Sequence, residues 1–346
     1  MAIRDYWGFD NLPAITSGTG IVAFLRGDIT VTGVYSIYGQ ITSVAGGWLG
    51  FTAGNNPYPN TNYGVYTPSM NHPYQALSDF TTRRSFIGFR INMNNNSVGT
   101  PVLSLSNTAG TKQALLTNTQ LGVNINQYVE VMIDRANTQI VVWIDGVAQP
   151  PVFFDFNAFV SVDNKCNLVW GTNGNGPLYY FQIRDVYFLD DTQDATLCNR
   201  LGSIDIAPCA LASVTAPNWT SSDSATPLAD LSTVLGTTIA TQTNPLQTEP
   251  PSMDPVQFQL SNAGLLPSEQ ILAVKADLSG LRTPSYAFAP KASMAINGQT
   301  VQGKQLTYPN GAQYYWNQNM FVLEKAPDGT AWTPQALAGM VATLTP

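Results

Sequence analysis

The chain has 346 residues, which is enough for one large domain or two ordinary domains with real hydrophobic cores. Only 11% of the residues are charged, whereas roughly 25% is usual in soluble proteins. The net charge of -7 argues against nucleic acid as a partner, because phosphate binding needs clustered Lys and Arg. No apolar run approaches the roughly 18 residues of a membrane span, so no membrane insertion is expected. The N-terminal residues also lack the apolar segment of a secretory signal.

Short β-strands with tight turns are predicted over residues 1–50, where apolar runs alternate with Gly, Thr and Ser. Residues 54–82 differ, because they are rich in Pro, Asn and Tyr and lack periodicity, which predicts a long surface loop. The tyrosines of this loop are candidates for subunit packing or, alternatively, for stacking on a sugar. They are Tyr58, Tyr63, Tyr66 and Tyr74.

A β-hairpin at residues 127–147 is the predicted centre of the first domain. Val129, Val131 and Ile133 alternate with more polar residues, which is the two-residue period of a strand with one wet face. A polar turn follows, and a second apolar strand ends at Asp145-Gly146, a favoured hairpin turn pair.

Further strands are predicted on either side of this hairpin, at residues 85–93, 100–107, 112–118, 167–174 and 178–191. In the first of them, apolar residues lie on one side and Gly88, Arg90 and Asn92 lie on the other. The last strand is expected to place Tyr179, Phe181, Ile183, Tyr187 and Leu189 together. Because no segment before residue 190 has a helical period, an all-β sandwich of ten or more strands is predicted.

The order of these features resembles the concanavalin A-like, or laminin-G-like, jelly roll. The resemblance covers residues 1–210 and is most specific in the hairpin at 127–147 and in the strand at 178–191. It implies a jelly-roll sandwich, but this fold is shared by lectins, glucanases and viral proteins, so it does not by itself give a function.

The second half of the chain begins with an irregular linker at residues 211–255, rich in Ala, Ser, Thr, Pro, Gln and Asn, with one short helix expected near 227–235. A smaller C-terminal β-sandwich module is predicted over 256–346. Near its end, Thr333 as N-cap, Pro334 at the first helical position and Gly339 after the end predict a short helix. Residues 340–346 are expected to close the chain as an edge strand.

This module resembles the C-terminal module of tailed-bacteriophage virion proteins, in which it follows a concanavalin A-like domain. The recognisable part is the D-G-T-A-W-T segment at residues 328–333, together with an N-W-T at 218–220 in the linker. The resemblance implies a virion protein that assembles in the host cytoplasm, has other capsid or tail proteins as partners and forms a homo-oligomer.

Catalytic patterns are weak in the sequence. The single histidine, His72, lies in the long loop, and no nucleophile elbow accompanies it. Glu130 and Asp134 share a strand side and Asp145 lies on the partner strand, but an ordinary polar sheet face has the same pattern. The chain is therefore predicted not to be an enzyme.

No cofactor and no metal ion are expected either. Asp190-Asp191 with Asp194, or Asp155 with Asp163, offer oxygen ligands for calcium without a recognisable loop spacing. The three cysteines form no metal-binding pattern. They are interpreted as free thiols, with a bridge between Cys198 and Cys209 left open.

The leading hypothesis is a structural component of a phage virion, such as a capsid decoration, collar, tail-fibre or baseplate protein, that acts by assembly. The alternative is a lectin-like protein of the virion that binds a surface glycan through the tyrosine loop and the turn holding Asn173 and Asn175. A glycoside hydrolase is the third hypothesis.

Overall fold

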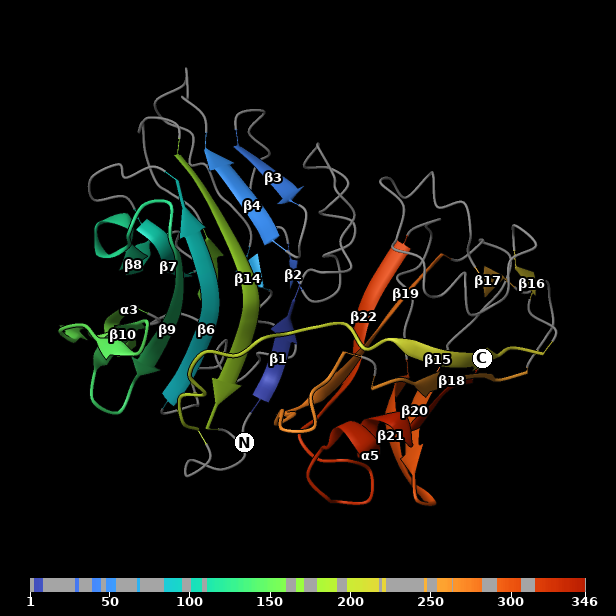
Figure 1. Ribbon diagram of the computed structural model, residues 1–346. Coiled ribbons are helices and arrows are strands. Elements are labelled where there is room, and N and C mark those ends of the chain that lie inside the picture. The colour runs from blue at the N-terminus through green and yellow to red at the C-terminus, as the bar shows by residue number, and fades with distance from the viewer. Residues whose placement is uncertain are drawn as a thin grey trace. The chain divides into compact units, whose positions relative to one another are not determined.

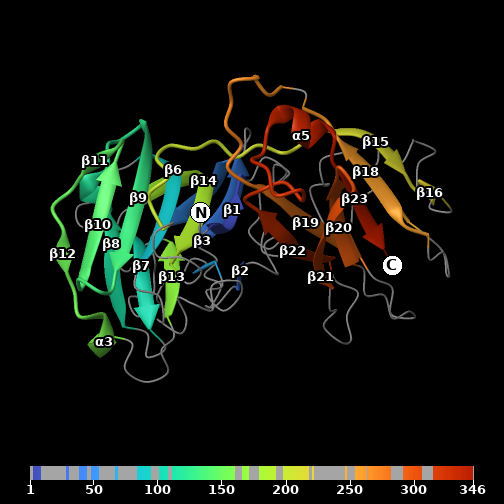
Figure 2. The ribbon, with the colours of Figure 1, turned by 90° about the horizontal axis from the view of Figure 1, so that it is seen from below.

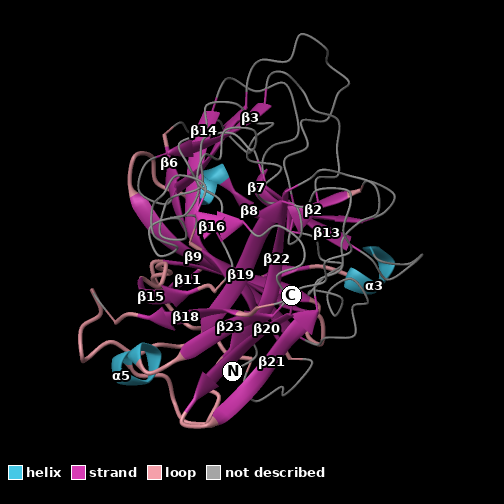
Figure 3. Cartoon of the chain, turned by 90° about the vertical axis from the view of Figure 1, so that its right-hand side faces the viewer, coloured by secondary structure: helices cyan, strands magenta, loops and turns pink. Residues whose placement is uncertain are grey.

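The chain divides into two compact units, Met1–Ala207 and Pro208–Pro346, in this computed structural model (Figure 1). The structure describes residues 3–8, 29–30, 39–44, 48–53, 67–68, 84–94, 101–107, 111–159, 166–170, 179–191, 198–217, 220–221, 246–247, 254–262, 264–281, 291–305 and 315–345. Strands dominate both units, as the magenta ribbons in Figure 3 show. Within the described residues, no helix is both long and apolar enough to cross a bilayer.

A nine-stranded antiparallel sheet is the main layer of the first unit (Figure 1). Its order is β11 (Val147–Ala148), β10 (Gln139–Ile144), β9 (Asn126–Asp134), β6 (Arg84–Met93), β14 (Tyr179–Asp190), β4 (Trp48–Ala53) and β3 (Gly39–Val44), with β1 (Ile3–Trp7) beside β14 and β12 (Val152–Phe153) beside β10. The central strands β9, β6 and β14 are buried over most of their length.

A three-stranded sheet forms the second layer of this unit (Figure 2). It consists of β13 (Cys166–Trp170), β7 (Pro101–Asn107) and β8 (Lys112–Thr117), and the unit also holds the short pair β2 (Ile29–Thr30) and β5 (Thr67–Pro68), the 3-10 turn η1 (Asn118–Gln120) and the helix α3 (Phe156–Phe159). The alternating apolar residues of the large sheet are buried on its inner face, with Ile87, Phe89, Val129 and Val131 all at 0% exposure. The predicted sides of β6 are therefore confirmed.

The central hairpin forms as predicted. β9 pairs with β10 from Asp134–Gln139 to Val129–Ile144. Positive φ angles at Asp145 (50°) and Gly146 (82°) fit a two-residue turn of the type that matches strand twist.

One prediction for β14 is wrong. Its register against β6 shifts between Arg184 and Tyr187, where an extra residue forms a β-bulge with Asp185 at φ 52°. Phe181 and Ile183 face the core, whereas Tyr187 and Leu189 turn to the opposite face of the sheet.

The second unit is built on a five-stranded antiparallel sheet (Figure 1). Its order is β15 (Leu211–Thr215), β18 (Val256–Leu260), β23 (Val341–Thr345), β20 (Lys291–Ile296) and β21 (Gln299–Gln305), and the unit also holds the hairpin β19 (Val274–Leu281) with β22 (Tyr315–Leu323) and the short pair β16 (Thr220–Ser221) with β17 (Leu246–Gln247). Trp332 is buried in its core, and the indole Nε1 donates to the Leu323 carbonyl at 2.8 Å.

The predicted short helix of this unit is confirmed as α5 (Pro334–Ala338). The Thr333 side chain accepts from the Ala336 amide at 3.0 Å, and Gly339 follows the helix. The closing strand is not an edge strand, because β23 pairs with β18 on one side and β20 on the other. Ala342 and Leu344, two positions apart on β23, pack into the core of this unit.

The predicted all-β fold is confirmed, with a jelly-roll sandwich and a smaller C-terminal β module. The long loop at 54–82 lies almost entirely outside the described residues. The turn at 171–176 and the helix expected near 227–235 lie outside them altogether.

Candidate functional site

The outer face of the nine-stranded sheet, which points away from the core, changes character along its strands. On β6, Phe86 at one end is 4% exposed, while Arg90 and Asn92 at the other end are partly exposed. Their β14 partners follow the same division, because Leu189 is buried and Gln182 is partly exposed. We call the two parts the covered half and the open half.

The covered half lies under residues 198–206, which we call the strap and which end just before the second unit begins. The strap contributes Cys198, Leu201 and Ile204 to a cluster with outer-face residues. The outer-face members are Phe86, Tyr128, Met132, Val141, Trp143, Tyr187 and Leu189. Burial of these apolar groups on both sides stabilises the strap against the sheet.

The prediction of a wet face on β9 is therefore wrong. Glu130 and Asp134 are each 1% exposed and Met132 is 8% exposed. Sequence periodicity indicates only the side of a strand that packs on the core. The strap that covers the other side lies more than 60 residues further along the chain; Arg200, for example, is 70 residues from Glu130.

Glu130 is one of two buried carboxylates that bind the strap. It accepts hydrogen bonds from the Tyr187 hydroxyl, from the Gly202 amide at 2.9 Å and from Arg200 at 3.0 Å. The Tyr187 ring reaches it by crossing β6 above Gly88, which pairs with both residues. A buried carboxylate with three donors is electrostatically compensated.

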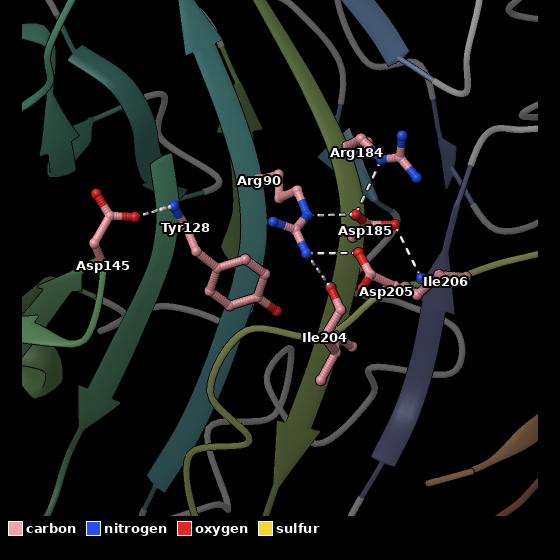
Figure 4. A network of polar contacts seen from close by, with 8 residues as sticks. All are labelled: Arg90, Tyr128, Asp145, Arg184, Asp185, Ile204, Asp205 and Ile206. Carbon is pink, nitrogen blue, oxygen red and sulfur yellow. Dashed lines mark hydrogen bonds and ion pairs between the residues drawn. The ribbon is translucent and has the colours of Figure 1, made fainter. Parts of the chain in front are cut away.

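Asp185, at the bulge of β14, is the second carboxylate (Figure 4). Its Oδ2 accepts from Arg90 Nε at 2.8 Å and from Arg184 Nε at 3.0 Å, and its Oδ1 accepts from the Ile206 amide at 3.0 Å. On the strap, Asp205 Oδ1 lies 2.6 Å from Arg90 Nη2. These contacts connect two neighbouring strands and the end of the strap.

The pKa values of two tyrosines and one arginine in this network are raised. Burial raises the pKa of the Tyr128 and Tyr187 hydroxyls far above the usual range, and the negative charge of Glu130 raises both further. Burial alone would lower the pKa of Arg90, but Asp185 and Asp205 outweigh it, so the pKa of this guanidinium is raised. Both hydroxyls therefore stay protonated, and that of Tyr187 donates to Glu130.

Among the described side chains, the open half presents polar groups and the ring of Trp48. Arg90 of β6 pairs with Arg184 of β14, and Trp48 of β4 lies beside Arg184. The Arg184 guanidinium lies 5.7 Å from the centre of the Trp48 ring, at cation–π distance.

A second row of the open half consists of amides. Asn126, Asn92 and Gln182 are cross-strand neighbours, and Asn92 Nδ2 donates to Asn126 Oδ1 at 2.7 Å. Asn126 is exposed and the other two are partly exposed. Amides can donate and accept together, which suits them to ligands rich in hydroxyl groups.

The predicted ligand or contact residues are not tested by this geometry. All of them lie outside the described residues: Tyr58, Tyr63, Tyr66, Tyr74, Asn173 and Asn175. Trp48, Gln182 and Arg184 were not predicted as site residues. The available signal was the outward Arg90 and Asn92 on β6, because residues paired with them on neighbouring strands share their face.

The three carboxylates considered as catalytic candidates, Glu130, Asp134 and Asp145, do not form one cluster. Asp134 binds Arg84 and Asn137, whereas Asp145 accepts from the Tyr128 amide at 2.8 Å. Glu130 is held by the strap contacts described above.

The calcium candidates and the single histidine are not tested, because each set includes a residue outside the described part of the chain. Among the described residues no group of three or more His, Cys, Asp or Glu could hold a metal ion. Asp163, Asp194 and His72 lie outside those residues. Cys198 and Cys209 are free thiols, so the bridge left open above does not form.

Comparisons with known proteins find matches among solved structures only. No family model and no curated protein matches the chain. Solved structures similar to it include a sialidase, at 12% identity and TM-score 0.33 over 49% of this chain and 17% of that chain. Others are a structure from work on botulinum neurotoxin type C and its interaction with two ganglioside molecules (12%, TM-score 0.34, 54% and 47%) and the alginate lyase Aly36B (10%, TM-score 0.32, 54% and 98%). The chain thus spans less than half of the first two.

The prediction that the chain is not an enzyme is contradicted by these neighbours. Several of them are enzymes by name, a sialidase and alginate lyases among them. The weak catalytic patterns of the sequence therefore do not class this chain as a non-enzyme.

Proposed function

We propose that this chain is a lectin-like carbohydrate-binding protein whose ligand site is the open half of the outer sheet face. The observation that carries this proposal is the amide row of Asn92, Asn126 and Gln182, together with the neighbouring Arg184 side chain that lies against the Trp48 ring. Sugar sites combine an aromatic surface for C–H groups with planar polar groups for hydroxyls.

Two further features support this proposal. The strap covers the apolar end of the outer face and leaves the amide-bearing end partly exposed, so burial alone does not explain the polar residues there. The network around Asp185 fixes Arg90 and Arg184 in place, and a preorganised site loses less side-chain entropy on binding.

A glycan array with the full chain tests the proposal. Binding is expected, and Trp48→Ala should weaken it about tenfold, since an aromatic contact contributes about 1.5 kcal/mol. Trp48→Phe keeps an aromatic ring and should retain most of the affinity. Gln182→Ala should weaken binding, whereas Gln257→Ala, at an exposed amide of the second unit, should not.

Two outcomes of this array would change the proposal. Absence of binding to every glycan, or equal binding by wild type and Trp48→Ala, would remove the open half as a site. Release of reducing ends from a bound glycan would extend the function to an enzyme acting on that glycan.

A second proposal, from a different class, is that the chain assembles with other proteins of a tailed-phage virion, in the host cytoplasm, as a homo-oligomer. The sequence resemblance supports it, and so does an apolar sheet edge in the first unit. Val147 (64% exposed), Val152 (50%) and Phe153 (75%) lie there on β11 and β12, which pair with β10.

Light scattering of the purified chain tests assembly. An oligomer that dissociates in Phe153→Asp but not in Gln257→Ala would support this edge as a contact. A monomer at every concentration would contradict the homo-oligomer.

A further inference from the structure

We infer that the open half selects neutral glycans over anionic ones, and that Asp205, together with Asp185, determines this selectivity. The inference rests on the proposed carbohydrate site and adds the chemical class of its ligand. It follows from how the two arginines of the site are neutralised.

The first neutralising group is Asp185. It is fully buried, and its Oδ2 alone accepts from the Nε atoms of both Arg90 and Arg184. Two guanidiniums that share one carboxylate would leave one positive charge at the surface, because the arginine side chains are 27% and 24% exposed. Alone, this trio would attract an anionic ligand.

The second neutralising group is Asp205. It comes from the strap, is 79% exposed, and places Oδ1 2.6 Å from Arg90 Nη2. The Ile204 carbonyl accepts from the same Nη2 at 3.2 Å (Figure 4). The strap thereby occupies Nη2 of Arg90, where a ligand carboxylate would otherwise bind.

Among the described side chains, this network combines two positive charges, on Arg90 and Arg184, with two negative charges, on Asp185 and Asp205. Elsewhere on the outer face, Arg200 is paired with Glu130 and Arg84 with Asp134, so these cations are compensated too. The whole chain carries a net charge of -7. A uronate carboxylate would have to displace Asp205 against this field, whereas hydroxyl groups can bind the amides without displacing a charge.

Titration of the full chain with oligosaccharides of one length tests the inference. The neutral probes are cellohexaose, mannohexaose and chitohexaose, and the anionic probes are hexagalacturonate and hexaguluronate. We expect at least one neutral probe to bind about tenfold more tightly than either hexauronate. Asp205→Asn should bind hexauronates about fivefold more tightly than wild type, which is the scale of one exposed ion pair. This gain should disappear in 1 M salt, where charges more than about 3 Å apart are screened.

Two control variants separate charge from structure. Asp205→Glu keeps the charge and should behave as wild type. Asp254→Asn changes the net charge equally in the second unit and should leave hexauronate binding unchanged. The first control shows whether the charge at residue 205 is what matters, and the second rules out a general effect of net charge.

The results distinguish this inference from the proposed function. A wild-type chain that binds hexauronates as tightly as neutral probes, and loses them with Trp48→Ala, would overturn the selectivity while keeping the site. An unchanged Asp205→Asn would also overturn it. Failure of every probe, with no effect of Trp48→Ala, would remove the carbohydrate site itself.

Discussion

Gly88→Ala is expected to destabilise the first unit strongly, because no side chain fits at this position. A Cβ at residue 88 would lie 2.0 Å from Cε1 and 2.4 Å from Cζ of Tyr187. These are atoms of a rigid ring, and Tyr187 is 0% exposed, so it has no free space into which to move.

The cost combines two effects. Overpacking of a dense core costs about 1–3 kcal/mol. Movement of the ring would also weaken its hydrogen bond to the buried Glu130 carboxylate, which contributes about 1.5–3 kcal/mol for a charged partner. Replacement of glycine lowers the entropy of the unfolded chain and returns up to about 1 kcal/mol. The net loss is about 3 kcal/mol, or roughly 10 °C in the midpoint of a unit of this size.

Calorimetry of the full chain measures this loss, with Gly122→Ala as the matched control. At Gly122 a Cβ would also be crowded, at 2.4 Å, but by the Cδ1 end of the 51% exposed Ile125 side chain. That side chain can rotate away, so Gly122→Ala should change the midpoint little or raise it. A loss below about 1 kcal/mol for Gly88→Ala, or equal losses for both variants, would refute the packing argument. In a Tyr187→Leu background, Gly88→Ala should lose most of its effect, since neighbouring residues couple.

Three further predictions concern single contacts. Arg200→Met leaves Glu130 buried without its cation, so the free energy of unfolding of the first unit should fall by roughly 3 kcal/mol in denaturant titrations. Arg200→Lys should lower this free energy less, and equal losses for the two variants would contradict the role of the ion pair. Thr333→Ala should cost the second unit about 1 kcal/mol and Thr333→Ser almost nothing, so the calorimetric transition that shifts identifies the second unit. Hydrogen bonds from Thr330 and Asn297 lower the pKa of Asp328 in the folded chain. The stabilisation by this carboxylate is therefore present above the unfolded pKa of 3.8 and is lost as pH falls through the lower folded pKa. Asp328→Asn should flatten this acid dependence in a pH series of melting curves, and an unchanged slope would contradict the prediction.

The inner face of the large sheet was predictable because burial leaves a direct trace in the sequence. Apolar residues at every second position of β6 and β9 can only face a core, whatever covers them. The hairpin turn was predictable for a similar local reason, since Asp145-Gly146 adopts the positive φ angles that the turn requires. The N-cap of α5 also lies within four residues of its partner.

The outer face was not predictable because its cover is remote in the sequence. The Ile204 carbonyl that accepts from Arg90 is 114 residues away from it in the sequence. The strap that contains Ile204 has no periodic pattern that would predict its packing on the sheet. Glu130 and Asp134 therefore looked like a solvated row. Their burial depends on donors such as Arg200, and single-sequence patterns contain no information about such pairs.

The bulge at Asp185 links the packing of the strap to the geometry of the open half. Without the extra residue, Val186 would oppose Gly88 and Tyr187 would point into the core. With it, Tyr187 crosses the glycine to reach Glu130, and the Asp185 carboxylate comes to lie between Arg90 and Arg184. The same local insertion thus creates both anchors of the strap and fixes the two arginines of the open half. Deletion of one residue at the bulge should consequently disturb strap, stability and ligand binding together, whereas a site formed independently of the strap would retain its affinity.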